Sequence, residues 1–563
     1  MKKITIWVLI ILGILFFILK GIEWRIESRF QDRMNSDPNR AYNITYSDFD
    51  LNTFFKGVTL DEVSIEPINP GKGTKITGHV DYATINGLVW RDLLFGKNLN
   101  INEIAFEQPL FEITPSADTT KKASGKGLQV MFGDILSRVT LNSFRIQNGS
   151  IVLLDPITKS IKGQIKQVNI SATEIETDSL KFKHIIPFQM GNLNVDIEDV
   201  TLELNDYTHF KLGYFHYNLK DKEILLNDVS LGYSIDWVEV SERVGIQNDI
   251  IELKVKEIGI HKMEPSSSFY TQLDIDAQKI SIDELDIKLQ RNKNISRPPD
   301  ALKPVFQGIV NSIPIAILID SIQISNSSLT YSELGVNKNE SGSIEIQQIN
   351  GTITDLTNMP EQQISKGQLN ATINASLKGK ADINLDLTVP YDDETFLLDL
   401  DVGSMDLTNL NPALKPLAGV ELVSGQMHRI KLHMDAGPIH SQNKLAFDYS
   451  DLQINLLKEK SKNKTKKRVL FSAIANSAIR PDNMPGQDKY LGAEYQSKRN
   501  IYRSPINYIL QGLFIRKKKK ERKVKRTNYM KTKLEFIFMF KQQNDRWFFY
   551  TRPSRVVIGV LKL

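Results

Sequence analysis

The chain has 563 residues, of which 41% are hydrophobic, 24% are charged and none is cysteine. At roughly 150 residues per domain, this length predicts three or four units, and the hydrophobic content is that of a folded chain. The lack of cysteine excludes a disulfide framework, a thiolate metal site and a cysteine nucleophile.

The net charge of +5 comes from two short basic runs: residues 458–468 carry +6 and residues 516–526 carry +8, so the rest of the chain carries about −9. A nucleic-acid-binding body would spread Lys and Arg over one folded face, so this acidic body argues against a nucleic-acid partner. The second run follows an apolar stretch and is either a solvated tail or a contact for anionic lipid headgroups. Its candidate headgroup contacts are Arg516, Lys517, Lys518 and Lys519.

Residues 4–19 form an almost unbroken apolar stretch that follows Lys2 and Lys3, and the segment from residue 4 to residue 24 is 21 residues long. Roughly 20 such residues suffice to cross a bilayer. The alternative is a cleaved signal peptide, which needs small residues after its apolar core. Because the next residues here are bulky and charged, we expect residues 1–24 to be an uncleaved transmembrane anchor.

From about residue 41 onward, apolar and polar residues alternate with a period of two. This period predicts strands with one apolar and one wet face, arranged as an antiparallel sheet. Helical patterns are few: residues 133–139, residues 301–312 and a segment that begins near residue 505. The candidate lining residues of the apolar face are Leu193, Val195, Ile197, Ile251, Leu253, Val255, Ile383, Leu385, Leu387, Phe396, Leu398 and Leu400.

Four short segments recur in the same order, 166 to 181 residues further along. The pairs are residues 60–65 (LDEVSI) with 226–231 (LNDVSL), 101–104 (INEI) with 282–285 (IDEL), 144–151 (FRIQNGSI) with 322–329 (IQISNSSL), and 165–169 (IKQVN) with 346–350 (IQQIN). They indicate a duplicated unit of several strands, although any alternating chain yields some such echoes. We expect a first β unit over residues 25–190, a repeat-related second unit over 191–375, a C-terminal sheet with a closing helix and basic run over 376–526, and an extra tail over 527–563.

A sheet of this length has a large apolar face, which the few predicted helices cannot cover. The sheet can close on itself, a second sheet can pack on it, or lipid can occupy the face. Exposed apolar area above a few hundred Å² marks an interaction surface. Beside a membrane anchor, lipid is the favoured occupant.

These elements resemble the AsmA-like family of bacterial envelope proteins, whose members are bridge-like lipid-transfer proteins. The resemblance covers about residues 1–526, and the tail lies outside it. It rests on the anchor and on residues 46–51 (YSDFDL), 57–65 (GVTLDEVSI), 83–90 (ATINGLVW), 99–104 (LNINEI), 410–416 (LNPALKP), Gly425, 449–457 (YSDLQINLL) and 500–518, which contain Tyr508 and Gly512. The order of these segments along the chain is what carries the likeness.

The resemblance implies a mainly β fold: an N-terminal transmembrane helix, then a long, curled antiparallel β-sheet that forms an elongated apolar groove, with a few short helices. It places the chain in the bacterial inner membrane, as a single-pass protein with its body in the periplasm. The charges that flank the span, two Lys before it and Lys20, Arg25, Arg29 and Arg33 after its apolar run, would by themselves favour a cytoplasmic body. The resemblance also implies movement of phospholipid between the two membranes, and it supplies no catalytic residues.

Catalytic motifs are missing from the sequence: there is no H-E-x-x-H, no G-x-x-x-x-G-K-[ST] loop and no G-x-S-x-G elbow. We therefore expect no enzyme, no cofactor and no metal site. The first hypothesis is a membrane-anchored protein that conducts phospholipid along an apolar groove and supports outer-membrane lipid homeostasis. Its partners would be phospholipid, the inner membrane through residues 4–24, and outer-membrane or periplasmic proteins. The alternative is a non-enzymatic structural or assembly factor for outer-membrane biogenesis that acts through protein contacts.

Overall fold

The computed structural model covers only part of the predicted anchor, and neither basic run. It describes residues 14, 17, 20–21, 23–32, 40–52, 57–68, 74–89, 99–116, 139–175, 190–263, 274–457, 480–488, 490–513, 540–543 and 546–549. Most of the predicted span 4–24, the headgroup candidates Arg516 to Lys519 and most of the predicted helix 133–139 lie outside these residues. Within them, no helix has both the length and the hydropathy that crossing a bilayer requires.

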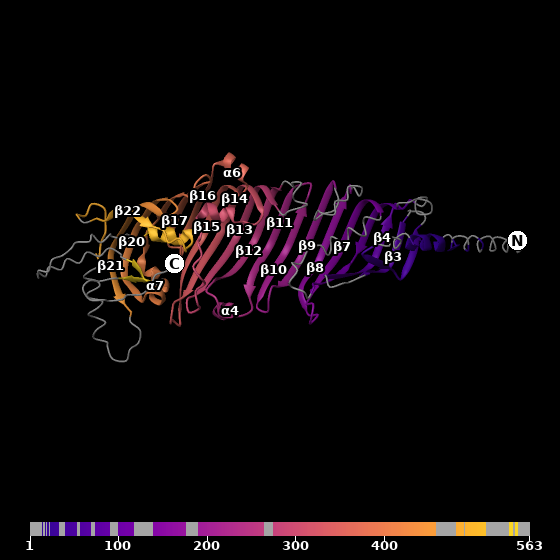
Figure 1. Cartoon of the computed structure of the whole chain (residues 1–563), viewed down its shortest axis with the longest axis horizontal. Helices are drawn as coiled ribbons and strands as arrows, with labels where there is room; N and C mark the ends of the chain where they lie inside the picture. The colour runs from indigo at the N-terminus through magenta and orange to yellow at the C-terminus, as the bar shows by residue number, and fades with distance from the viewer. Residues whose placement is uncertain are drawn as a thin grey trace. The chain divides into compact units, whose positions relative to one another are not determined.

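The described chain is mainly β, with 62% strand and 14% helix, as the two-residue alternation predicts. Among these residues, strands β1 to β22 belong to one mixed sheet, while β23 (Phe540–Gln543) and β24 (Arg546–Phe549) form a separate two-stranded sheet (Figure 1). The chain divides into two compact units. The first comprises Met1–Val229 and Gly259–Asp274, and the second comprises Ser230–Ile258 and Ile275–Leu563.

The first unit is built almost wholly from strands, after a helix over residues 23–32. Its strands are β1 (Tyr42–Thr45), β2 (Asp48–Asn52), β3 (Gly57–Pro67), β4 (Lys75–Asn86), β5 (Leu99–Glu107), β6 (Leu110–Thr114), β7 (Val139–Leu154), β8 (Ile161–Thr173), β9 (Asn192–Glu203) and β10 (Thr208–Asn218), with parts of β11 (Glu223–Tyr233) and β12 (Asp249–Met263).

The expectation of a wholly antiparallel sheet is wrong in the first unit. β5 and β6 both pair with β7 in parallel, with Ile101 opposite Leu141 and Phe111 opposite Ile151. Parallel neighbours need a connection of a dozen or more residues, and the chain between β6 and β7 is long enough to supply one. Alternation in the sequence reports which face a side chain takes and carries no information on strand direction.

The core of the first unit lies on the apolar side of its earliest strands. Ile26 and Phe30 of the N-terminal helix are buried in it, and the Phe30 ring lies 5.7 Å from the ring of Phe49. Further along, Phe106 and Phe144 meet edge to face at 5.6 Å. This end of the apolar side is therefore covered by the chain itself.

The second unit adds short helices to its strands (Figure 1). Its strands are β13 (Asp274–Asn292), β14 (Ala316–Leu334), β15 (Ser341–Thr357), β16 (Gln368–Leu377), β17 (Ala381–Pro390), β18 (Phe396–Val402), β19 (Met405–Asp406), β20 (Val420–Ala436), β21 (His440–Leu456) and β22 (Gly492–Lys498). Its helices are α4 (Trp237–Val244), α5 (Phe306–Asn311), α6 (Pro360–Lys366), the 3-10 turn η2 (Leu407–Leu410), α7 (Asn411–Ala418) and α9 (Pro505–Gly512).

Both helices predicted in this unit form. The first was expected over residues 301–312 with a proline in its opening turn, but α5 begins after that proline, at Phe306. The second begins at Pro505, as predicted, where the side chain of Ser504 accepts a hydrogen bond from Asn507 N and caps the helix.

A third parallel neighbour pair occurs between β13 and β14. Leu285 N donates to Ser327 Oγ, 42 residues away, and Ser328 Oγ donates to Asp286 Oδ1, again 42 residues away. Near the strand ends, Lys293 N donates to Leu334 O. Because partners advance together along both strands, β13 and β14 run in the same direction.

Candidate functional site

The long strands carry irregularities that keep apolar residues on one face. In β7 the register shifts between Ile146 and Gly149, where Asn148 takes a left-handed backbone conformation with φ of 52°. An extra residue of this kind is a β-bulge, and Asn tolerates the conformation better than most residues. Residues three apart across the shift, such as Ile146 and Gly149, then point to the same side.

Strands β8, β9 and β10 each make one such three-residue step, so apolar side chains of β7 to β10 line up across the strands. We call these the apolar rows of the first unit. Read from β7 to β10, they are Ile146, Ile170, Val195 and Tyr217; Gly149, Val168, Ile197 and Phe215; Ile151, Ile165, Val200 and Leu212; and Leu153, Gly163, Leu202 and Phe210.

Burial of the side chains changes from one row to the next. The first row lies against the N-terminal core, where Ile146 and Tyr217 are buried. In the last two rows most side chains, including Val200, Leu202 and Phe210, are only half-buried. Large apolar side chains that keep contact with solvent on one continuous face are characteristic of a binding surface.

The opposite face of the same strands is polar. Tyr214 Oη donates to Asp196 Oδ1 at 2.6 Å, and His216 Nδ1 lies 2.7 Å from the same oxygen. The hydrogen bond to Asp196, followed by burial, raises the pKa of Tyr214 to about 12. Lys166 pairs with Asp199 at 3.0 Å. The sheet is thus two-faced, as the alternation predicts.

The predicted candidates of β9 lie in this arrangement. Val195 and Ile197 belong to the rows, and Leu193 continues the same face opposite Ala172 and is buried. Their neighbours in β7, β8 and β10 were missed, because the three-residue steps break the simple alternation by which candidates were chosen. The signal was present as i, i+3 apolar pairs such as Ile197 and Val200.

The second unit has equivalent rows on β14 to β18. One row is Ile322, Ile353, Ala371, Leu387 and Leu398; the next is Ile324, Gly351, Ile373, Leu385 and Leu400. The six candidates of β17 and β18 therefore share one face, as expected. Ile383 continues it opposite Val402, and Phe396 lies opposite Ala436.

Helices cover this face at its C-terminal end. The Phe396 ring contacts Phe306 of α5 and Tyr508 of α9 edge to face, at 5.1 and 6.0 Å. Phe396 and Leu398 are 0% exposed. Both belong to a buried cluster with Tyr508, and Leu385 and Leu387 pack against this cluster. Ile383 and Leu400 pack against a second buried cluster, which contains Leu407 of η2 and Ala418 of α7. The expectation that helices leave the face uncovered is wrong here, because segments distant in sequence return to it.

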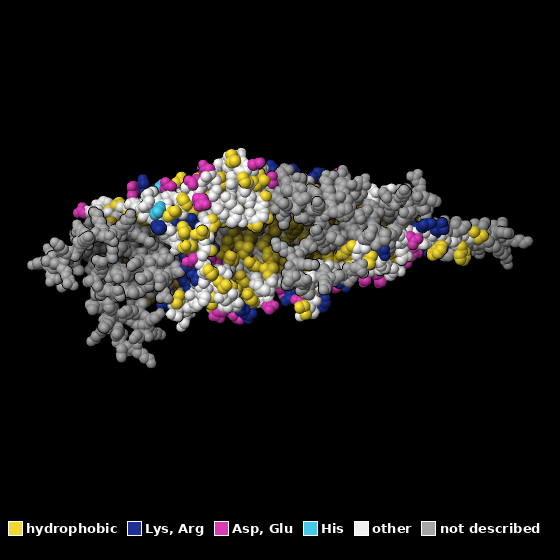
Figure 2. Space-filling model, viewed as in Figure 1, with side chains coloured by type: hydrophobic (Ala, Val, Ile, Leu, Met, Phe, Trp, Pro, Cys, Tyr) yellow, Lys and Arg dark blue, Asp and Glu magenta, His cyan; other side chains and the backbone are white. Residues whose placement is uncertain are grey.

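Away from its covered C-terminal end, the apolar side of the second unit is open. Ile251 of β12 is 42% exposed, Leu253 is half-buried and Val255 is buried. Figure 2 shows hydrophobic side chains gathered in a hollow over the strands that Figure 1 labels β12 and β13. Half-buried apolar residues of this region are Leu285, Ile287, Leu289, Ile324, Leu329, Ile344 and Ile346.

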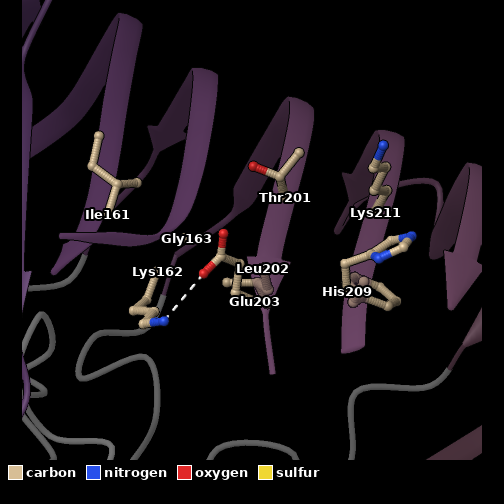
Figure 3. A pocket seen from close by; sticks show the side chains of 9 residues that line it. Ile161, Lys162, Gly163, Thr201, Leu202, Glu203, His209 and Lys211 are labelled. Carbon is tan, nitrogen blue, oxygen red and sulfur yellow. Dashed lines mark hydrogen bonds and ion pairs between the residues drawn. The ribbon is translucent and has the colours of Figure 1, made fainter. Parts of the chain in front are cut away.

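A shallow pocket of about 190 Å³ lies where β8, β9 and β10 approach their ends in the first unit (Figure 3). Lys162 pairs with Glu203 at 3.2 Å beside it. A side chain at Gly163 would come within 2.5 Å of Leu202 Cδ2, so the glycine keeps this spot clear. The pocket is too small to hold an acyl chain and lies at the margin of the rows.

In the part of the chain that the structure describes, no group of three His, Asp or Glu side chains could hold a metal ion. Scans of this sequence against protein-family models and against curated proteins found no match.

Proposed function

We propose that this protein binds phospholipid along the apolar face of its sheet and conducts it there, as a single-pass protein anchored through residues 4–24 with its body in the periplasm. The observation that carries the proposal is the half-buried state of most side chains in the last two apolar rows on β7 to β10 and of the apolar side chains on β13 to β15. The anchor and the compartment rest on the N-terminal hydropathy and on the family resemblance.

The driving force would be the hydrophobic effect, at about 0.8 kcal/mol per methylene removed from water. Acyl chains would lie on the apolar rows, while headgroups stay in water. Movement along a row, from one strand to the next, requires no bond making, since neighbouring strands offer nearly the same apolar surface. Support for an outer-membrane role comes from the resemblance alone.

A matched pair of variants in β9 tests this proposal. Val200→Asp places a carboxylate on the apolar rows, while Thr201→Asp places the same charge on the next residue, which faces the polar side opposite Lys211. We expect Val200→Asp to lower phospholipid transfer between vesicles at least about tenfold, because a charge in an acyl path costs several kcal/mol to desolvate. Thr201→Asp should transfer at the wild-type rate.

Lipid extraction after gentle purification provides the second measurement. The wild-type protein and Thr201→Asp should retain phospholipid that mass spectrometry detects, and Val200→Asp should retain less. Equal transfer by both folded variants, together with lipid-free wild-type protein, would contradict the proposal and favour an assembly factor that acts through protein contacts.

A further inference from the structure

Charged residues occupy the apolar side of the second unit at one end of β12, β13 and β14. We call this group the charged belt: Asp249, Arg291, Lys293 and Glu333, with the hydroxyl of Tyr331. Side chains at every second position of a strand point to the same face, and this alternation places the charged belt on the apolar side. Arg291 and Lys293 follow Leu285, Ile287 and Leu289 at every second position of β13 and just beyond its end. Tyr331 and Glu333 follow Leu329 in the same way.

The partners of the neighbouring residues support this placement. Lys288, three positions before Arg291, faces the other way and lies 3.8 Å from Glu252 on the polar side. Across the sheet, Tyr331 pairs with Ile344 and Glu333 with Gly342, where a side chain would meet Leu417 of α7 at 2.5 Å. The belt thus borders both the open apolar residues of β13 to β15 and the covered end.

The belt has an inner and an outer pair. Lys293 pairs with Glu333, whose second oxygen accepts a hydrogen bond from Tyr331 Oη at 2.8 Å; the side chains of Lys293 and Glu333 are 11% and 2% exposed. Arg291 donates to both oxygens of Asp249, at 2.7 and 2.5 Å, and the two side chains are 33% and 34% exposed. Burial lowers the pKa of Lys293, and that of Arg291 remains raised by Asp249 despite burial.

Stability alone gives a weak reason for this arrangement. Buried ion pairs are often no better than apolar residues of the same size, because both charges lose their hydration. The rows beside the belt show that apolar residues fit this face. Arg291 also has spare binding capacity: a guanidinium has five N–H donors, and Asp249 takes two of its nitrogens. Within the described residues Asp249 is its only hydrogen-bond partner.

We propose that Arg291 binds the phosphodiester of a phospholipid whose acyl chains lie on the open apolar residues of β13, β14 and β15. The inference rests on the proposed function and adds a headgroup site to it. Asp249 holds the guanidinium in place on one edge, and its free edge meets two phosphate oxygens in the same forked geometry. The inner pair fixes the end of β13 against β14.

The test compares two lipids with identical acyl chains, phosphatidylglycerol and diacylglycerol, bound to the full-length protein in mild detergent. The wild type should bind phosphatidylglycerol about tenfold more tightly, the size of one charge-assisted contact. Arg291→Gln should remove most of that preference and leave diacylglycerol binding unchanged. Lys288→Gln removes a cation from the same strand on the opposite face and should change neither affinity.

Arg291→Gln leaves Asp249 without its partner, so the double variant Asp249→Asn/Arg291→Gln is measured beside it. It should show the same loss of preference with no unpaired carboxylate. A full preference for phosphatidylglycerol in the folded double variant would overturn the headgroup site. Displacement of phosphatidylglycerol by millimolar inorganic phosphate would also overturn it, since the site would then hold a free anion. If the wild type binds neither lipid, the proposed function itself fails.

Discussion

Asn148 and Asn326 occupy the left-handed backbone region, with φ of 52° and 50°. The backbone N–H of each donates to the side-chain oxygen of an asparagine on the next strand: Asn148 N to Asn169 at 2.8 Å, and Asn326 N to Asn350 at 3.0 Å. A branched side chain would clash with its own backbone here, whereas asparagine is tolerated. Short polar side chains at these positions are thus explained by backbone conformation rather than by contact with a ligand.

Two substitutions at Asn148 separate backbone strain from other effects. Asn148→Ile should lower the free energy of unfolding by about 1–2 kcal/mol, because a β-branched residue is strained at positive φ. Asn148→Gly keeps the N–H that donates to Asn169 and should be close to neutral. Urea unfolding of the two variants measures the difference, and equal midpoints would contradict the assignment of strain.

Asp401 provides a prediction for acid pH. The hydrogen bond from Arg429 Nε, at 3.0 Å, and the charge of Arg429 lower the pKa of Asp401. The pair therefore stabilises the fold above the unfolded pKa of about 4, and this contribution is lost as pH falls through the lower folded value. Because the pair is partly exposed, we expect less than about 1 kcal/mol.

Unfolding by urea at several pH values below 5 measures this effect. Wild-type stability should fall with acid more steeply than that of Arg429→Leu, which lacks the partner of Asp401. Parallel curves for the two proteins would show that the pair carries no pH-dependent stability.

Among the strands and helices, periodicity in the sequence predicted which residues form strands and which share a face. β9, β12, β17, β18 and β21 all contain the runs chosen for their alternation, and α9 begins where its pattern begins. What periodicity missed depends on contacts between distant segments. The parallel pairing of β5 with β7 and the packing of α5 and α9 over Phe396 are of this kind.

The candidate site was predicted in part for the same reason. Val195 and Ile197 lie on the apolar rows of the first unit. Phe396 and Leu398 are buried under α5 and α9, and the sequence did not predict that these helices pack there. Arg291 and Asp249 were not singled out, because charged residues near a strand end usually belong to a turn. The sequence feature that could have identified Arg291 is its position: it follows Leu285, Ile287 and Leu289 at every second residue and so falls on the apolar side of its strand.

Covered and open parts of one face should differ in their response to truncation. Leu398→Ala creates a cavity under α5 and α9 and should cost about 2–5 kcal/mol of unfolding free energy. Ile324, in the adjacent row, is half-buried, and Ile324→Ala should cost clearly less, because part of its surface already meets water. Equal losses would show that Ile324 is packed like a core residue and that the face is closed there.

Over the whole chain, the predicted duplication stays a prediction, with new observations in its support. The register between β7 and β8 shifts at Ile146/Gly149 and Gly149/Ile151, and that between β14 and β15 shifts at Ile324/Ser327 and Ser327/Leu329. These positions correspond in the recurring segments 144–151 and 322–329. Each pair of strands also follows a parallel neighbour, β5 for β7 and β13 for β14.

Deleting single residues of β14 tests the role of the shift. Deletion of Asn326 turns a three-residue step into ordinary alternation, so Ile324 and Ser327 still point the same way. Deletion of Thr330, in a regular stretch, sends every later side chain to the opposite face. We expect the first variant to remain folded by circular dichroism and thermal melting, and the second to lose its cooperative transition.

A left-handed residue at a bulge inside a strand, such as Asn148 or Asn326, therefore marks a place where the polypeptide can gain or lose one amino acid without turning its apolar side outward. Related proteins with such a sheet can gain or lose single residues at many separate points while the fold stays the same. Common ancestry among proteins of this type is then better judged from the order of the bulges along their strands than from a residue-by-residue sequence alignment.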